Sequence, residues 1–124
     1  MIELVSDLGG GKTTFTKGLA KGIDSDDAVT SPTFTLNNIY RGSKLTIYHF
    51  DFYRLAEAGI MNEELAEVLR DSKAVTVVEW GDIVQDVLPQ SKLTIHITAS
   101  GETSRQYKIN VAKDLHYLVE GLSV

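Results

Sequence analysis

The sequence contains no cysteine, no long hydrophobic run and no signal peptide. Without cysteine, the chain has neither a disulfide nor a cysteine-based metal site. No stretch reaches the roughly 18 consecutive apolar residues that a membrane-spanning helix requires. The segment Met1–Val5 has no basic flank and no long apolar core, so it does not resemble a leader. These absences predict a cytoplasmic protein with no membrane association.

An excess of basic residues is also absent, because 12 Lys and Arg residues stand against 17 Asp and Glu residues, for a net charge of −5. Proteins that bind nucleic acids directly usually carry a basic surface. The densest group of cations is Lys12, Lys17 and Lys21, and the first of these belongs to a glycine-rich loop. Any contact with RNA or DNA is therefore predicted to be made mainly by another chain.

The hydrophobic pattern predicts one α/β domain that spans residues 1–124. Strands are predicted at residues 2–5, 35–41, 44–50, 74–80, 92–98 and 105–111. Helices are predicted at residues 11–23, 56–69, 82–88 and 113–122. In the first helix Phe15, Leu19 and Ile23 should form a buried stripe, and Asn62 should cap residues 63–69. This order indicates a sandwich whose mixed sheet has a parallel core and antiparallel additions.

The stretch VSDLGGGKTTF, Val5–Phe15, is close to the phosphate-loop pattern G-x-x-x-x-G-K-[ST], except that Ser6 replaces the first glycine. Glycines let backbone N–H groups converge on phosphate oxygens, and the following helix adds its positive N-terminal end. Lys12 would add a point charge, and the Thr13 hydroxyl would bind Mg²⁺. We interpret the loop as a phosphate site; the alternative is a glycine-rich turn that binds nothing.

Two carboxylates follow predicted strands at the edge of the sheet where ligands bind in open α/β folds. Asp51 follows residues 44–50, and Glu79 closes the apolar run from Ala74 to Val78. Together with Thr13 they are predicted to bind one Mg²⁺ and to orient an attacking water. The alternatives are a solvated strand-end carboxylate for Glu79, and an Arg54 partner or a helix cap for Asp51.

Other polar residues have a weaker basis in the sequence. Thr33, within Ser31–Phe34, is predicted to be a switch residue that senses the terminal phosphate through Mg²⁺, and the alternative is an ordinary proline turn. His49 is predicted not to be catalytic, because it alternates with its neighbours on a strand and has no partner histidine nearby, whereas His96 and His116 are predicted to be structural or surface residues. The sequence contains neither a Ser-His-Asp arrangement nor a zinc pattern.

Four motifs, SDLGGGKTTF, SPTF, HFDFYRL and VEWGD, occur in this order between Leu4 and about Arg105. The ordered set closely resembles the TsaE family, small bacterial ATPases of tRNA threonylcarbamoyladenosine biosynthesis. The resemblance implies a P-loop NTPase-like three-layer sandwich with a mixed, mainly parallel sheet. It also implies ATP and Mg²⁺ as cofactors, slow ATP hydrolysis, and work with the TsaB and TsaD proteins, which transfer threonylcarbamoyl to tRNA.

The resemblance also implies a role for each matching residue. Nucleotide-binding residues would be Leu8, Gly9, Gly10, Gly11, Lys12, Thr13, Thr14, Trp80 and Arg105. Catalytic residues would be Lys12 and Glu79, metal ligands would be Thr13, Asp51 and Glu79, and Thr33 would be the switch. Trp80 would lie near the nucleotide or a partner surface, with core packing as the alternative. For Arg105 the alternative is a cross-strand salt bridge.

The chain departs from the family in two respects. Ser6 and Gly10 replace the family's usual glycine and alanine. Relatives also generally carry a strand and a helix before the phosphate-loop strand, in which Met1 already lies. The expected fold therefore lacks that strand and helix, either because this lineage dispenses with them or because the coding sequence continues upstream. Their absence would expose a strand edge and leave the adenine site half open.

Three other classes of function are compatible with a phosphate loop. A small-molecule kinase usually needs a lid with several arginines, but the four arginines here are scattered: Arg41, Arg54, Arg70 and Arg105. A GTP switch would carry the guanine signature N-K-x-D, which is missing. A scaffold without turnover would not need Lys12, Thr13, Asp51 and Glu79 together. The kinase remains the main alternative to the partner ATPase.

Overall fold

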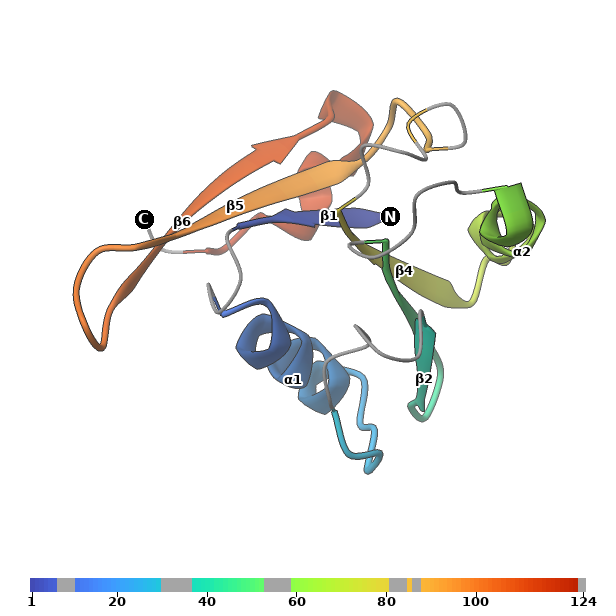
Figure 1. Ribbon diagram of the computed structural model, residues 1–124, viewed down its shortest axis with the longest axis horizontal. Coiled ribbons are helices and arrows are strands. Elements are labelled where there is room, and N and C mark those ends of the chain that lie inside the picture. Colours follow the sequence, from blue (N-terminus) through green and yellow to red (C-terminus); the bar gives the residue numbers. More distant parts are fainter. Residues whose placement is uncertain (7–10, 30–36, 53–58, 81–84, 86–87, 123–124) are drawn as a thin grey trace.

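The computed structural model describes the chain except for residues 7–10, 30–36, 53–58, 81–84, 86–87 and 123–124 (Figure 1). Its elements, in chain order, are β1 (Ile2–Val5), α1 (Lys12–Gly22), β2 (Asn37–Arg41), β3 (Thr46–Asp51), α2 (Gly59–Leu69), β4 (Ala74–Glu79), β5 (Leu93–Ala99), β6 (Arg105–Val111) and the 3-10 helix η3 (Lys113–Leu118). The strands form one six-stranded sheet in the order β2-β3-β4-β1-β5-β6.

The sheet has a parallel centre and one antiparallel strand at each edge, as the sequence predicted. β1 pairs in parallel with β4 and β5, and β4 pairs in parallel with β3. The edge strands β2 and β6 pair antiparallel with β3 and β5. Because the carboxyl ends of β1, β3 and β4 point the same way, residues that follow these strands gather at one edge of the sheet.

Helices cover the two faces of the sheet, which confirms the three-layer α/β sandwich. Val77 belongs to a core cluster that includes Ala20 of α1, whereas its neighbour Val78 belongs to a cluster that includes Leu65 of α2. Successive strand residues point to opposite faces, so α1 and α2 lie on opposite sides of β4. This arrangement also explains why β4 is an almost uninterrupted apolar run.

The first helix buries a different stripe from the one predicted. Its buried residues are Lys12, Thr16 and Ala20, whereas Phe15 and Leu19 are half-buried beside the core. Thr16 is compatible with burial because its hydroxyl donates to the main-chain oxygen of Lys12 at 3.0 Å. The prediction followed apolar residues alone, but the helix turns a charged residue and a hydroxyl toward the sheet.

The turn of the β2–β3 hairpin packs against the C-terminal end of α1. The Ser43 N–H donates to the carbonyl oxygen of Ile23 at 3.0 Å. A Cβ on Gly42 would lie 2.0 Å from that same oxygen, a separation that no side chain can adopt. Glycine at residue 42 therefore allows the hairpin to fix the end of α1, whose other end faces the carboxyl ends of the strands.

Two of the predicted helices are shorter in the structure, and a third lies mostly outside the described residues. The helix predicted at 56–69 begins at Gly59 in the structure, so Asn62 lies inside it and is not its cap. The helix predicted at 113–122 is the shorter η3, because its side chains are mostly exposed and too few pack on the sheet to stabilise an α-helix. The helix predicted at 82–88 lies mostly outside the described residues.

Among the helices that the structure describes, none has the length and apolar character needed to cross a membrane.

Candidate nucleotide site

Charged side chains are buried where α1 begins and β3 and β4 end. The group comprises one cation, two carboxylates and one imidazole, and its residues are Lys12, Asp51, Glu79 and His49. Their exposed fractions are 7% for Lys12, 2% for Asp51, 3% for Glu79 and 0% for His49. Buried charges are retained in proteins when they are paired or when they act on a ligand. We call these four residues the charged cluster.

Lys12 is the first residue of α1, and its ammonium group has several partners. Nζ donates at 3.2 Å to both the main-chain oxygen and the hydroxyl of Ser6, and it lies 3.9 Å from Oε1 of Glu79. The serine that replaces the first loop glycine therefore contacts the loop lysine directly. Sequence analysis missed this contact, although the strand exit and the lysine must approach each other at the two ends of a phosphate loop.

The two carboxylates are neighbours across a parallel pair of strands. Asp51 ends β3, Glu79 ends β4, and the two residues are paired in the register. The Phe52 N–H donates to the main-chain oxygen of Glu79 at 3.1 Å, which continues the pairing beyond the ends of both strands. Both carboxylates are thus carried by the sheet, as the sequence predicted, and the buried Glu79 is not the solvated strand-end group that was its alternative.

The imidazole of His49 completes the cluster, although the sequence predicted no functional role beyond that of a non-catalytic strand residue. It lies two residues before Asp51 on β3 and therefore on the same face of the sheet. Its Nε2 is hydrogen-bonded to Oε2 of Glu79. The spacing HxD on a predicted strand was the available signal, because residues i and i+2 share a face.

Trp80 immediately follows Glu79 and turns the chain. Its φ of 56° lies in the left-handed region, which bulky residues seldom adopt and which often marks functional sites. The Lys12 ammonium lies 5.2 Å from the centre of the Trp80 ring, within the range of a cation–π interaction. Trp80 also packs against the core cluster on the α2 side, so it both contributes to the core and borders the charged cluster.

The N-terminus of α1 is suited to bind an anion. Gly11 caps it with a φ of 103°, a conformation that favours glycine, and this N-cap residue provides no side-chain hydrogen bond. The first turn contains no acidic residue; it holds Thr13 and Thr14, of which Thr13 is half-buried. Helix dipole and Lys12 together create a positive field at this end.

Arg105 starts β6 and extends over the loop end. A Cβ on Gly11 would lie 3.9 Å from the Arg105 Nε. The Arg105 Nη1 donates to the main-chain oxygens of Gly101 and Ser104 at 3.3 and 2.8 Å. No ion pair within the described part of the chain includes Arg105, so the alternative of a cross-strand salt bridge finds no support there. Its role in nucleotide binding stays a prediction.

The remaining predicted site residues lie outside the described part of the chain. They are Leu8, Gly9, Gly10 and Thr33, together with Arg54, the alternative partner of Asp51. The structure therefore brings together Lys12, Asp51, Glu79 and Trp80, with Gly11, Thr13, Thr14 and Arg105 around the start of α1.

The oxygen donors at this edge are those that Mg²⁺ prefers, namely two carboxylates and a threonine hydroxyl. Within the described ranges, no group of three or more His, Cys, Asp or Glu residues is arranged to hold a metal ion. The predicted trio of Thr13, Asp51 and Glu79 has only two acidic members, so it would need phosphate or water oxygens to complete a magnesium shell. The donor chemistry fits the ion, and the ligand assignment stays a prediction.

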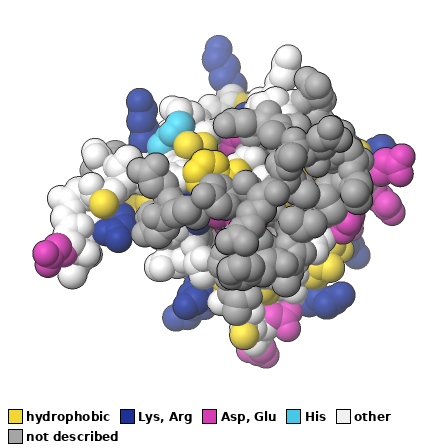
Figure 2. Space-filling view, viewed as in Figure 1, with side chains coloured by type: hydrophobic (Ala, Val, Ile, Leu, Met, Phe, Trp, Pro, Cys, Tyr) yellow, Lys and Arg dark blue, Asp and Glu magenta, His cyan; other side chains and the backbone are white. Residues whose placement is uncertain are grey.

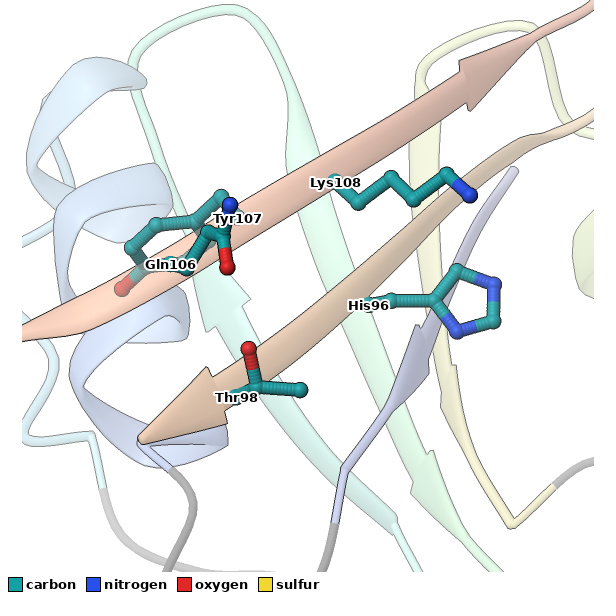
Figure 3. Close-up of a pocket in the computed structure, with 5 residues that line it drawn as sticks. All are labelled: His96, Thr98, Gln106, Tyr107 and Lys108. Atoms are coloured by element: carbon teal, nitrogen blue, oxygen red, sulfur yellow. The ribbon is translucent and has the colours of Figure 1, made fainter. Parts of the chain in front are cut away.

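A hollow lies on the β5–β6 hairpin, and none of the residues that line it belongs to the charged cluster. Its volume is about 390 Å³, and the residues that line it are His96, Thr98, Gln106, Tyr107 and Lys108 (Figure 3). Leu93, Ile95 and Ile97 of β5 point into the core on the α1 side, so the alternate residues His96 and Thr98 face the other way. In Figure 2 a histidine on the displayed face lies beside basic and hydrophobic side chains. Among the described residues that line this hollow there is no carboxylate.

Comparison with known proteins decides the family. The model of the family "Threonylcarbamoyl adenosine biosynthesis protein TsaE" matches residues 1–107. The chain belongs to the TsaE family. It is 38% identical over 107 residues to TsaE of Bacillus subtilis and 38% identical over 109 residues to TsaE of Treponema pallidum. These matches cover 86% and 88% of this chain, and 66% and 80% of the two relatives.

A solved structure supports the fold. The crystal structure of YdiB from Bacillus subtilis is 33% identical, with a TM-score of 0.71 over 96% of this chain and 73% of that one. TsaE proteins are named for tRNA threonylcarbamoyladenosine biosynthesis, and this family membership assigns the chain to that process. The described parts of three resemblance motifs, with Lys12, His49 and Glu79, meet at the charged cluster.

Proposed function

We propose that the chain is a Mg²⁺-dependent subunit that binds and hydrolyses ATP and supports threonylcarbamoyladenosine formation on tRNA. One observation carries this proposal: the Lys12 ammonium at the start of α1 lies 3.9 Å from the Glu79 carboxylate at the end of β4. A phosphate-binding cation and a carboxylate able to orient water are thus next to each other, as phosphoryl transfer to water requires.

Each residue would have a separate task. The α1 N-terminus and Lys12 would bind the phosphate oxygens, the helix through main-chain N–H groups and the lysine through its charge. Thr13 and Asp51 would hold the metal, and Glu79 would orient the attacking water and share in metal binding. A bound Mg²⁺ supplies charge neutralisation at the phosphate oxygens. Glu79 already has one oxygen bound to His49 and the other near Lys12.

The partner side of the proposal rests on the family and on charge. TsaB and TsaD are the expected partners, with the ATPase acting on their complex in the cytoplasm, where tRNA is modified. The net charge of −5 disfavours direct binding to the tRNA backbone, so contact with tRNA would run through the partners. Two arginines, Arg41 and Arg105, are found in the described strands at opposite edges of the sheet, so they do not form the clamp that a kinase lid needs.

Calorimetric titration of ATP and ADP with Mg²⁺ tests the binding step. We expect a Kd in the micromolar range, roughly −8 kcal/mol. Hydrolysis is then measured with and without the TsaB–TsaD pair of the same organism, and the pair should raise it. No ATP binding would overturn the proposal. Transfer of labelled phosphate to a nucleoside or another small metabolite would replace it with the kinase alternative.

A further inference from the structure

His49 is the most deeply buried polar side chain of the charged cluster. It lies in the middle of β3, has no exposed surface, and is flanked in the register by Val77 of β4. Its ring points to the α1 side of the sheet, the side on which Asp51 and Glu79 also lie. Burial of an imidazole at this position has to be compensated, because a leucine or valine would pack there without the cost of desolvating a polar ring.

The hydrogen bonds of the ring define its orientation. Nε2 is bonded to Oε2 of Glu79, and an ionised carboxylate only accepts, so Nε2 donates. Nδ1 is buried and has no hydrogen-bond partner within the described part of the chain. A buried N–H without an acceptor is costly, whereas a bare ring nitrogen costs less. These contacts are those of the tautomer that carries its proton on Nε2.

We propose that His49 is a positioning residue that fixes the Glu79 carboxylate through the Nε2 hydrogen bond. A glutamate side chain has three rotatable torsions, and the hydrogen bond to Oε2 removes most of that freedom. The other oxygen, Oε1, is then held on the side of Lys12 and the start of α1. This inference rests on the proposed function, since it assigns His49 a part in the orientation of water by Glu79.

The main chains of both His49 and Glu79 are held in place by the pairing of β3 with β4. His49 is held by the β3–β4 ladder, and the main-chain oxygen of Glu79 is held by the Phe52 N–H. Functional carboxylates placed on strands and fixed by a buried second residue keep their geometry better than those on loops. The hydrogen bond is thus suited to hold one carboxylate orientation before any substrate binds.

Paired substitutions at His49 separate positioning from packing. The amide of His49→Gln places an N–H close to where Nε2 lies, whereas His49→Leu fills the space without a donor. We expect His49→Leu to lower kcat at least tenfold with the Kd for ATP within about threefold of wild type. His49→Gln should keep kcat within about threefold. His96→Leu, on β5 at the hollow, is the matched control and should leave both constants unchanged.

A second measurement needs neither ATP nor turnover. Long-range ¹H–¹⁵N spectra of the ligand-free chain report which nitrogen of each of the three histidines carries a proton. The His49 signals are those lost in His49→Gln. A protonated Nε2 beside a bare Nδ1 is expected, and these signals should change in Glu79→Gln. A proton on Nδ1 alone would overturn the proposal.

The outcomes distinguish this proposal from the proposed function. If the wild-type chain binds no ATP, the proposed function fails, and His49 no longer has a reaction to serve, so both are overturned. If the chain binds and hydrolyses ATP but a folded His49→Leu has the wild-type kcat, only the positioning role is overturned. Equal losses of kcat in folded His49→Gln and His49→Leu would overturn it as well. Thermal melts show which variants are folded.

Discussion

His49 and His96 both lie in strands of the same sheet, but their surroundings differ completely. His49 is fully buried between β2 and β4, and its ring is bonded to a buried carboxylate. His96 lies between β1 and β6, is half-buried, and lines a hollow beside Lys108. In Figure 3 the His96 ring and the Lys108 side chain project in the same direction.

The two regions differ in how far their charged groups depend on one another. In the charged cluster each ionic group is shielded from water, so each depends on the others, and removing one leaves its partner uncompensated. On the β5–β6 hairpin, solvent takes the place of a partner, so a lysine or histidine there is replaceable at little cost. The same residue types should therefore give opposite results in the two regions.

The largest expected effect is the difference in ATP affinity between alanine variants of two lysines, one in each region. Lys12→Ala removes the charge that faces the phosphate site, and we expect ATP affinity to fall about 100-fold, close to 3 kcal/mol. Lys108→Ala, in the hollow, should change the affinity by less than about twofold. Calorimetry on both variants makes the measurement. Equal effects at the two lysines would contradict the assignment of the phosphate site to the charged cluster.

The next effect is at the glutamates, and it should appear in turnover and not in binding. Glu79→Gln keeps the shape of the side chain but removes the charge that orients water, so kcat should fall about 100-fold. The Kd for ATP should stay within about threefold of wild type. Glu102→Gln, at the exposed tip of the β5–β6 hairpin, is the control. Parallel losses of binding and turnover in Glu79→Gln would make Glu79 a structural residue.

Sequence patterns predicted most of this cluster because the chemistry of a strand end depends on order and spacing. The Lys12, Asp51 and Glu79 positions followed from a glycine-rich loop and two strands whose carboxyl ends point the same way. His49 was missed because its partner lies 30 residues away on another strand. Only the β3–β4 register brings the two together, and register is a tertiary property.

The same limit explains the errors in the helices. Alternation and β-branched residues predicted the strands to within a few residues, since both edges of each run carry local signals. The η3 segment contains helix-forming residues, but the type and length of helix that it forms depend on how much of it packs on the sheet. For α1, the apolar stripe gave the helix but not the buried Lys12, whose burial is due to partners from Ser6 and Glu79.

Arg105 lies where the two regions meet, so its effect should be intermediate. Its side chain extends from the hairpin to Gly11 but is exposed and bound to main-chain oxygens of its own turn. Arg105→Ala should weaken ATP binding about fivefold, close to 1 kcal/mol. Arg41→Ala, on the opposite edge strand, should have no effect. An unchanged affinity in Arg105→Ala would assign the arginine to the hairpin alone.

The smallest effect should come from Ser6, the serine that replaces the family's usual loop glycine. Ser6→Gly removes one of the acceptors that hold the Lys12 ammonium, while the main-chain oxygen of residue 6 remains. We expect ATP affinity to rise by less than about threefold, because one hydrogen bond contributes about 1 kcal/mol. The melting temperature should fall slightly, since glycine loses more backbone entropy on folding.

Ser6→Ala separates the hydroxyl from the backbone in that experiment. It removes the same acceptor without adding conformational freedom, so equal affinities of the alanine and glycine variants would assign the effect to the hydroxyl. A change in Ser6→Gly alone would instead assign it to the flexibility of the loop. A fall in affinity in both variants would mean that the serine supports nucleotide binding, which contradicts the expected rise.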